Sequence, residues 1–102
     1  MKVHTEAVHF KADNALIEYV EKKVSRLEHF FDRILDAQVI LKLENSGQVR
    51  DKIAEVILKV PGETIVVKDT HKTFEASIDS ACATLKRQLI RYKEKMRVKS
   101  SK

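Results

Sequence analysis

The side chains in this sequence that could do chemistry are cations, and they are concentrated near one end. The stretch "LKRQLIRYKEKMRVKSSK" closes the chain. Eight Lys and Arg but only one acid occur from residue 80 to residue 102, whereas the other 79 residues carry a net charge of −2. The whole positive excess of a protein with net charge +5 therefore lies in one segment. Such a concentration predicts an anionic partner.

The spacing of these cations predicts a binding surface on a helix. Arg87, Arg91 and Lys95 recur every four residues, which places them along one exposed stripe. Lys86 and Lys93 lie at a different angle, beside the apolar positions. Cations that only complement a helix dipole would explain one turn of positive charge, but not three turns with a single acid. We interpret the segment as a phosphate-binding face, because Arg binds phosphate in a bidentate manner and Lys adds point charge.

A second, smaller group of cations lies in an earlier amphipathic segment. Lys22, Lys23 and Arg26 alternate with glutamates there, which alone is typical of a salt-bridged helix surface. If both helices pack on one face of a sheet, the two groups would merge into one patch. Tyr92 lies among the cations and could stack on a base, but its helical spacing from Leu89 favours a core position. The predicted RNA-binding residues are Lys22, Lys23, Arg26, Lys86, Arg87, Arg91, Lys93 and Lys95.

No other set of residues predicts a catalytic, metal or cofactor site. The four histidines are scattered without the His-x-x-x-His spacing of a helical metal site, so we expect them on the surface: His4, His9, His29 and His71. The only glycines, Gly47 and Gly62, fall in predicted turns rather than in a phosphate loop. Cys82 lies on an apolar helix face and is predicted to be a buried structural thiol. We therefore expect neither an enzyme nor a cofactor, a metal or a small-molecule substrate.

The elements that must position these cations follow from the apolar periodicity. Residues 2–10 alternate as in a strand, and Asp13 caps a predicted helix that runs to about Phe31. The β-branched runs between residues 36 and 69 predict three strands, separated by the turn signals "NSG" and "PG". Thr73 caps a second helix, predicted to end near Arg97. Its expected apolar face consists of Phe74, Ile78, Cys82, Leu85, Leu89, Tyr92 and Met96.

The order β-α-β-β-β-α predicts an α+β fold with two layers. The first strand, helix and second strand can form a crossover unit, the last three strands an antiparallel meander, and both helices one layer on a four-stranded sheet. We expect a single domain over residues 1–97, followed by a flexible tail over residues 98–102. One cysteine, no membrane-length apolar run and no signal-peptide pattern at the N-terminus predict a cytoplasmic protein.

The partner that fits two helices presented from a sheet is a shaped RNA, read through phosphates and 2′-hydroxyl groups. Several segments add a resemblance to a known family: "FFDRI", the strand "VILKLE", "EASID" and the basic helix "LKRQLIRYKEK". Together they make residues 1–97 resemble the short form of the ribosome hibernation promoting factor family, also named ribosome-associated inhibitor or sigma-54 modulation protein.

The resemblance implies a domain similar in arrangement to double-stranded RNA-binding domains. It further implies docking on the small ribosomal subunit and its rRNA, in the channel for mRNA and tRNA, with repression of translation in resting or stressed, stationary-phase cells. We expect a monomer away from the ribosome. Residues that match basic positions of the family are Lys23, Arg26, Arg87, Arg91, Lys93 and Lys95, whereas Lys22 and Lys86 come from the charge pattern alone. The sequence leaves open whether ribosome dimers are promoted. A general double-stranded RNA-binding module acting away from the ribosome is the alternative.

Overall fold

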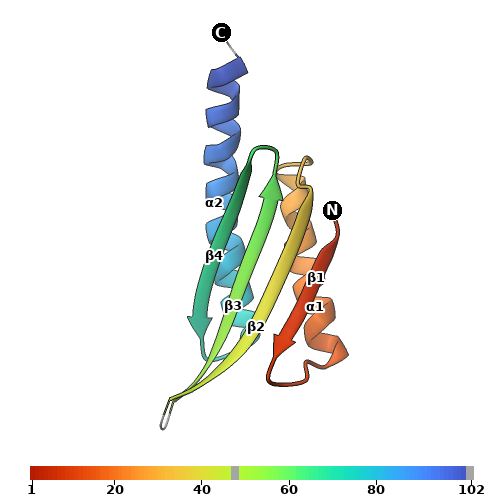
Figure 1. Cartoon of the computed structure of the whole chain (residues 1–102), viewed down its shortest axis with the longest axis vertical. Coiled ribbons are helices and arrows are strands. Elements are labelled where there is room, and N and C mark those ends of the chain that lie inside the picture. The colour runs from red at the N-terminus through yellow and green to blue at the C-terminus, as the bar shows by residue number, and fades with distance from the viewer. Residues whose placement is uncertain (47–48, 101–102) are drawn as a thin grey trace.

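The fold has one four-stranded sheet and one layer of helices (Figure 1). The computed structural model describes the backbone of residues 1–46 and 49–100 and the side chains of residues 1–44 and 51–97. The strands are β1 (Val3–Val8), β2 (Asp36–Ser46), β3 (Val49–Val60) and β4 (Glu63–His71). They lie side by side in chain order; β1 is parallel to β2, and the other pairs are antiparallel. The predicted crossover and meander are confirmed.

The turn between β3 and β4 is the one that the sequence specifies most sharply. Val60 pairs with Glu63, so only Pro61 and Gly62 make the reversal. Gly62 has φ +77°, a conformation that glycine adopts without the steric cost of a Cβ atom. The other predicted turn, "NSG", includes Gly47, which lies outside the described residues. Strand β2 ends just before it, at Ser46.

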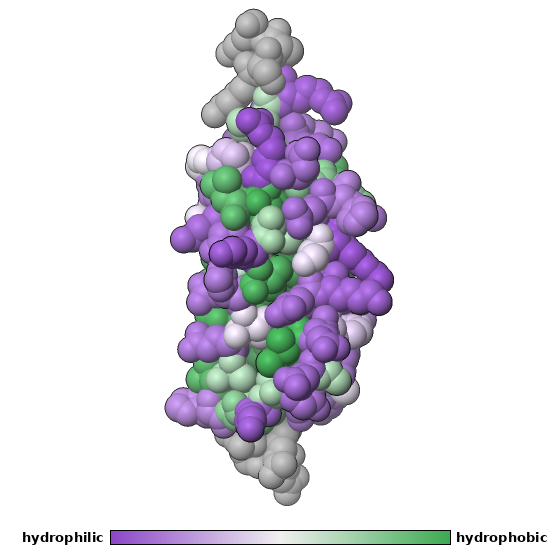
Figure 2. All heavy atoms as spheres, turned by 90° about the vertical axis from the view of Figure 1, so that its right-hand side faces the viewer, coloured by the Kyte–Doolittle hydropathy of each residue, from purple (hydrophilic) through white to green (hydrophobic). Residues whose placement is uncertain are grey.

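The core lies between the sheet and the helices. In β3 the core-facing positions Ala54, Val56, Leu58 and Val60 alternate with outward ones, as the two-residue period of a strand requires. No described helix covers the other face of the sheet. An edge-on view from the side of β1 and the first helix shows hydrophilic side chains over most of the surface, with apolar groups visible in a narrow central column (Figure 2).

The first helix is shorter than predicted. Helix α1 spans Asn14–Ser25, and the amide of Leu16 donates to the side chain of its N-cap, Asp13, at 2.8 Å. The chain then tightens into a 3₁₀ helix, η1 (Arg26–His29), instead of continuing to Phe31. The amides of Phe30 and Phe31 both bond to the carbonyl of Leu27, and Leu27 itself is buried. The apolar rhythm thus continues past Ser25, although the backbone has left the α-helix.

The second helix is longer than predicted. Helix α2 spans Phe74–Ser100, and the amide of Ala76 donates to the hydroxyl of Thr73, the predicted cap. The helix backbone therefore includes three of the five residues expected to form a tail, and residues 101 and 102 lie outside the described part. Its C-terminal end projects beyond the β3–β4 turn (Figure 1). Met96, assigned to the apolar face, is 39% exposed because no strand lies beneath this end.

Candidate nucleic-acid interface

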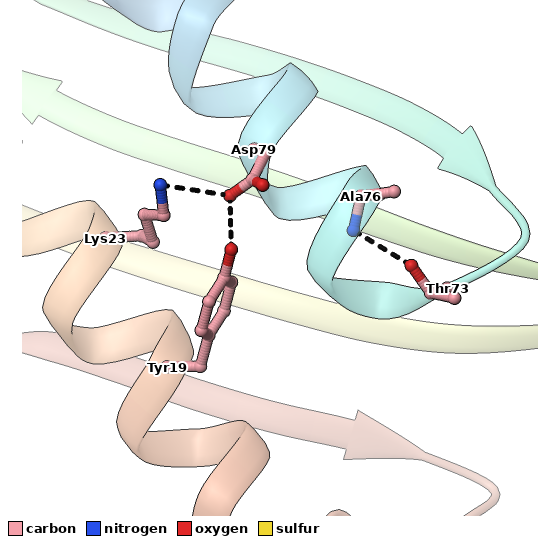
Figure 3. Close-up of polar contacts among 5 residues, drawn as sticks. All are labelled: Tyr19, Lys23, Thr73, Ala76 and Asp79. Atoms are coloured by element: carbon pink, nitrogen blue, oxygen red, sulfur yellow. Dashed lines mark hydrogen bonds and ion pairs between the residues drawn. The ribbon is translucent and has the colours of Figure 1, made fainter.

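Both helices lie on the same face of the sheet, as the predicted merging of the two basic groups requires. Helix α1 packs on the β1 side and α2 on the β3–β4 side, and the two helices contact each other. Three side chains join them. The hydroxyl of Tyr19 donates to Oδ1 of Asp79 at 2.7 Å, and Nζ of Lys23 lies 3.3 Å from the same oxygen (Figure 3).

A hollow between the helices brings together three of the predicted RNA-binding cations. Lys23 comes from α1, Arg26 from η1 and Lys86 from α2. The tightened backbone at Arg26 is thus part of the site, although the sequence predicted a continuous helix there. The residues that line this hollow, called here the interhelical groove, are Lys23, Arg26, Leu27, Phe30, Asp79, Cys82, Ala83 and Lys86.

Phe30 organises the cations at one end of the groove, a role that the sequence did not reveal. Nζ of Lys86 lies 4.6 Å from the centroid of its ring, a cation–π contact. Nζ of Lys93 donates to its backbone carbonyl at 2.9 Å. The carbonyl is available because η1 ends here. The "FFDRI" motif, which begins at Phe30, marked this position in the sequence but gave no indication of its contacts.

The remaining predicted RNA-binding cations of α2 form a separate row, called here the outer row: Arg87, Arg91 and Lys95. All three are exposed. Residues four apart advance by about 40° around an α-helix, so the row winds from the outer surface toward the sheet edge. Arg91 and Lys95 there line a shallow hollow together with Glu63 and Gln88. The structure therefore divides the predicted patch into two parts on either side of α2.

Lys22 lies on the exposed surface of α1, one position away from Lys23 but outside the lining of the interhelical groove. This position follows from helix geometry, because Tyr19, Lys23 and Arg26 share the side toward α2. Lys22 can add charge near the groove without contacting its floor.

The predicted cations are almost entirely without acidic partners. Within the described side chains, the only ion pair that any of the eight makes is that of Lys23 with Asp79. Arg87 donates instead to the hydroxyl of Thr84 at 3.3 Å, within its own helix. Lys and Arg held on a rigid helix without carboxylates are available to bind an external anion.

Two residues near the cations belong mainly to the core. Tyr92 is 5% exposed, its hydroxyl donates to the carbonyl of Pro61, and its ring meets Phe31 edge to face at 5.2 Å. Its predicted core position is confirmed, and stacking on a base is not open to it. Cys82, expected to be a buried structural thiol, is half-buried because it lines the groove. Burial raises the pKa of its thiol to about 11, which disfavours the nucleophilic thiolate.

The four histidines are exposed, as expected. The described residues include no cluster of three or more potential metal ligands among His, Cys, Asp and Glu. None of the described helices has the length and apolarity to cross a membrane.

Comparison with known proteins shows the family of this chain. Residues 3–97 match the family described as "Sigma 54 modulation protein / S30EA ribosomal protein". The chain belongs to this family. A ribosome hibernation promoting factor of Azotobacter vinelandii is 41% identical, over 93% of this chain and 85% of the relative.

Solved structures of similar proteins have the same fold. A ribosomal subunit interface protein from Coxiella burnetii superposes with a TM-score of 0.82 at 26% identity, covering 92% of this chain and 99% of that one. The N-terminal domain of Thermus thermophilus Protein Y gives 0.78 at 30% identity, covering 90% and 99%. The predicted α+β fold and family are confirmed, and the residues of the candidate interface remain a prediction.

Proposed function

We propose that this S30EA family member is a ribosome hibernation factor that acts by binding and not by catalysis. Its helix layer docks on rRNA of the small ribosomal subunit, in the channel used by mRNA and tRNA, and represses translation in resting or stressed cells. The observation that carries this proposal is the set of eight cations on the helix layer, in α1, η1 and α2, seven of which make no ion pair within the described side chains.

The arrangement suits structured RNA better than an extended strand. The cations lie on both flanks of α2 and on the neighbouring surface of α1, so they can contact several backbone phosphates at once. Two aromatic rings among the cations already have partners, because Tyr92 packs edge to face on Phe31 and the Phe30 ring carries Nζ of Lys86. This leaves little free aromatic surface for stacking single-stranded bases. Relatives named for ribosome hibernation and for the ribosomal subunit interface support the ribosome as the partner.

In this proposal residues 1–97 form one binding domain, and the protein is a cytoplasmic monomer away from the ribosome. It would need no cofactor, because occupying the channel blocks mRNA and tRNA sterically.

Sedimentation with purified bacterial ribosomal particles tests this proposal. The protein is expected to comigrate with small subunits and whole ribosomes in a sucrose gradient, in the presence of excess duplex RNA as competitor. Retention on the duplex, with none on ribosomal particles, would favour a general RNA-binding module and contradict the ribosomal role.

Titration in a reconstituted translation system tests the mode of action. Inhibition is expected to reach its limit near one protein per ribosome, because each bound molecule blocks one channel. Inhibition that is complete far below that ratio would indicate catalysis.

A further inference from the structure

Asp79 is an acid in a place where the other charges are positive. Among the described residues it is the only carboxylate that lines the interhelical groove, where the cations are Lys23, Arg26 and Lys86. One of its oxygens, Oδ1, contacts both Nζ of Lys23, at 3.3 Å, and the hydroxyl of Tyr19, at 2.7 Å (Figure 3). A phosphate oxygen that approached Lys23 would occupy the same kind of position, as a charged acceptor of its N–H groups.

We propose that Asp79 is a built-in competitor for RNA phosphate, which neutralises Lys23 in the free protein and thereby limits the affinity of the groove for RNA. The inference rests on the proposed function, since it names how binding at that same site is adjusted. Its effect is to keep the protein from binding RNA of any shape through charge alone, so that contacts from both the interhelical groove and the outer row are needed.

The exposure of the pair makes this exchange feasible. The side chains of Lys23 and Asp79 are 32% and 48% exposed, so an incoming phosphate can reach the lysine without opening the core. Ion pairs with this much contact with solvent are weak and screened by salt. Lys23 also lies 5.8 Å from the centroid of the Tyr19 ring, which keeps its ammonium at the groove when the carboxylate is displaced.

A purely structural role for Asp79 predicts something different. In that case the triad of Tyr19, Lys23 and Asp79 only holds α1 against α2, and any change that weakens the triad lowers RNA affinity. The hydrogen bond to Asp79 raises the pKa of Tyr19 to about 12, so Tyr19 and Asp79 interact whichever role is correct. The two roles are separated by changing charge and hydrogen bond independently.

Asp79→Asn is the decisive substitution, because the amide oxygen can still accept from Tyr19 while the negative charge is removed. With purified bacterial small ribosomal subunits as the probe, we expect tighter binding and a log–log salt slope steeper by roughly 0.7 to 0.9, the contribution of one added phosphate contact. The gain in affinity should be about threefold larger at about 50 mM than at about 200 mM salt. Asp36→Asn, on the opposite face of the sheet, makes the same charge change and should alter neither quantity.

Two further variants show whether the change in binding comes from the charge of Asp79 or from its hydrogen bond. Tyr19→Phe removes the hydrogen bond and keeps the ion pair, so it should leave the salt slope unchanged. Combining Asp79→Asn with Lys23→Gln should cancel the gain, since no lysine is released. If Asp79→Asn lowers helix content, Asp79→Ala replaces it, because alanine favours a helix at this half-exposed position.

The outcomes separate failure of this inference from failure of the proposed function. Wild-type protein that binds no ribosomal subunits would overturn the proposed function and this inference with it. Wild-type binding together with an Asp79→Asn variant of equal or weaker affinity and unchanged slope would overturn the inference alone. The inference would also be overturned if Tyr19→Phe tightened binding and steepened the salt slope as much as Asp79→Asn does, because loss of the hydrogen bond and not of the charge would then be the cause.

Discussion

The two faces of this domain carry similar side chains in different arrangements. On the uncovered face of the sheet, lysines stand opposite acids in the strand register: Lys59 opposite Asp36, and Lys68 opposite Glu55. On the helix layer, seven of the eight predicted cations lack an acidic partner within the described side chains. The sheet lysines thus have an acid in register beside them, whereas the positive excess of the chain lies on α2. Cations in excess over nearby acids on a rigid surface indicate a binding site, whereas lysines placed opposite acids indicate a solvated sheet.

The largest expected difference between the two faces is in ribosome binding after the charges of each face are reversed. Arg87→Glu with Arg91→Glu should abolish binding to small ribosomal subunits, because repulsion replaces two phosphate contacts. The fold should survive, since exposed substitutions usually change stability by less than about 0.5 kcal/mol and glutamate favours helix. Circular dichroism checks the helix content, and sedimentation checks binding.

Lys59→Glu with Lys68→Glu is the matched change on the sheet. It should cost stability, about 0.2 to 1 kcal/mol for each pair of like charges placed opposite each other, and leave ribosome binding intact. Loss of binding in this variant, with normal binding by the helix variant, would reverse the assignment of the two faces.

A smaller effect distinguishes the two parts of the helix surface. Replacing Arg87 and Arg91 by alanine should flatten the log–log salt slope by roughly 1.4 to 1.8, and replacing Arg26 and Lys86 by alanine should do the same for the groove. The quadruple variant should show the sum, because the two parts contact different phosphates. A slope that changes for only one pair would restrict the interface to that side of α2.

The boundary between core and binding surface is tested at Tyr92. Tyr92→Phe should lower the free energy of unfolding by about 1 kcal/mol, through loss of the hydrogen bond to the carbonyl of Pro61. Ribosome affinity should not change, because the ring faces Phe31 and not solvent. Chemical denaturation measures the first quantity. Weaker binding without a change in stability would restore a direct role for this side chain in RNA contact.

The smallest expected effect is a pH dependence of stability that arises from Tyr19, in the helix layer. Tyr19 has its pKa raised to about 12 by the hydrogen bond to Asp79, against an ordinary value of 10.0. The neutral phenol is thus favoured in the folded state, so its contribution to stability is complete below pH 10 and is lost as the pH rises toward 12. Tyr19→Phe should flatten this alkaline decline in melting temperature. An equally steep decline in the variant would assign the effect to other groups.

Most of the fold could be predicted because its determinants are local. Asp13 and Thr73 cap their helices through bonds to amides three residues away, and Gly62 supplies the positive φ of a two-residue turn. The helix ends were wrong because they depend on tertiary contacts. Leu27 enters the core through a tightened turn, and α2 continues past the edge of the sheet.

The candidate site was predictable as a set of residues but not as a geometry. Spacing placed Arg87, Arg91 and Lys95 in one row, since this depends on helix periodicity alone. It could not show that Lys93 reaches the carbonyl of Phe30, because those residues are 63 positions apart. Nor could it pair Asp79 with Lys23, which depends on how two helices pack against each other.

Covalent labelling of lysines tests the central claim most directly, because it reports both faces in one experiment. The protein, free and bound to small ribosomal subunits, is acetylated briefly and the reactivity of each lysine is read by mass spectrometry. Protection on binding is expected at Lys22, Lys23, Lys86, Lys93 and Lys95, with unchanged reactivity at Lys42, Lys59 and Lys68. Protection of the three sheet lysines, with the helix lysines as reactive as in the free protein, would contradict the account.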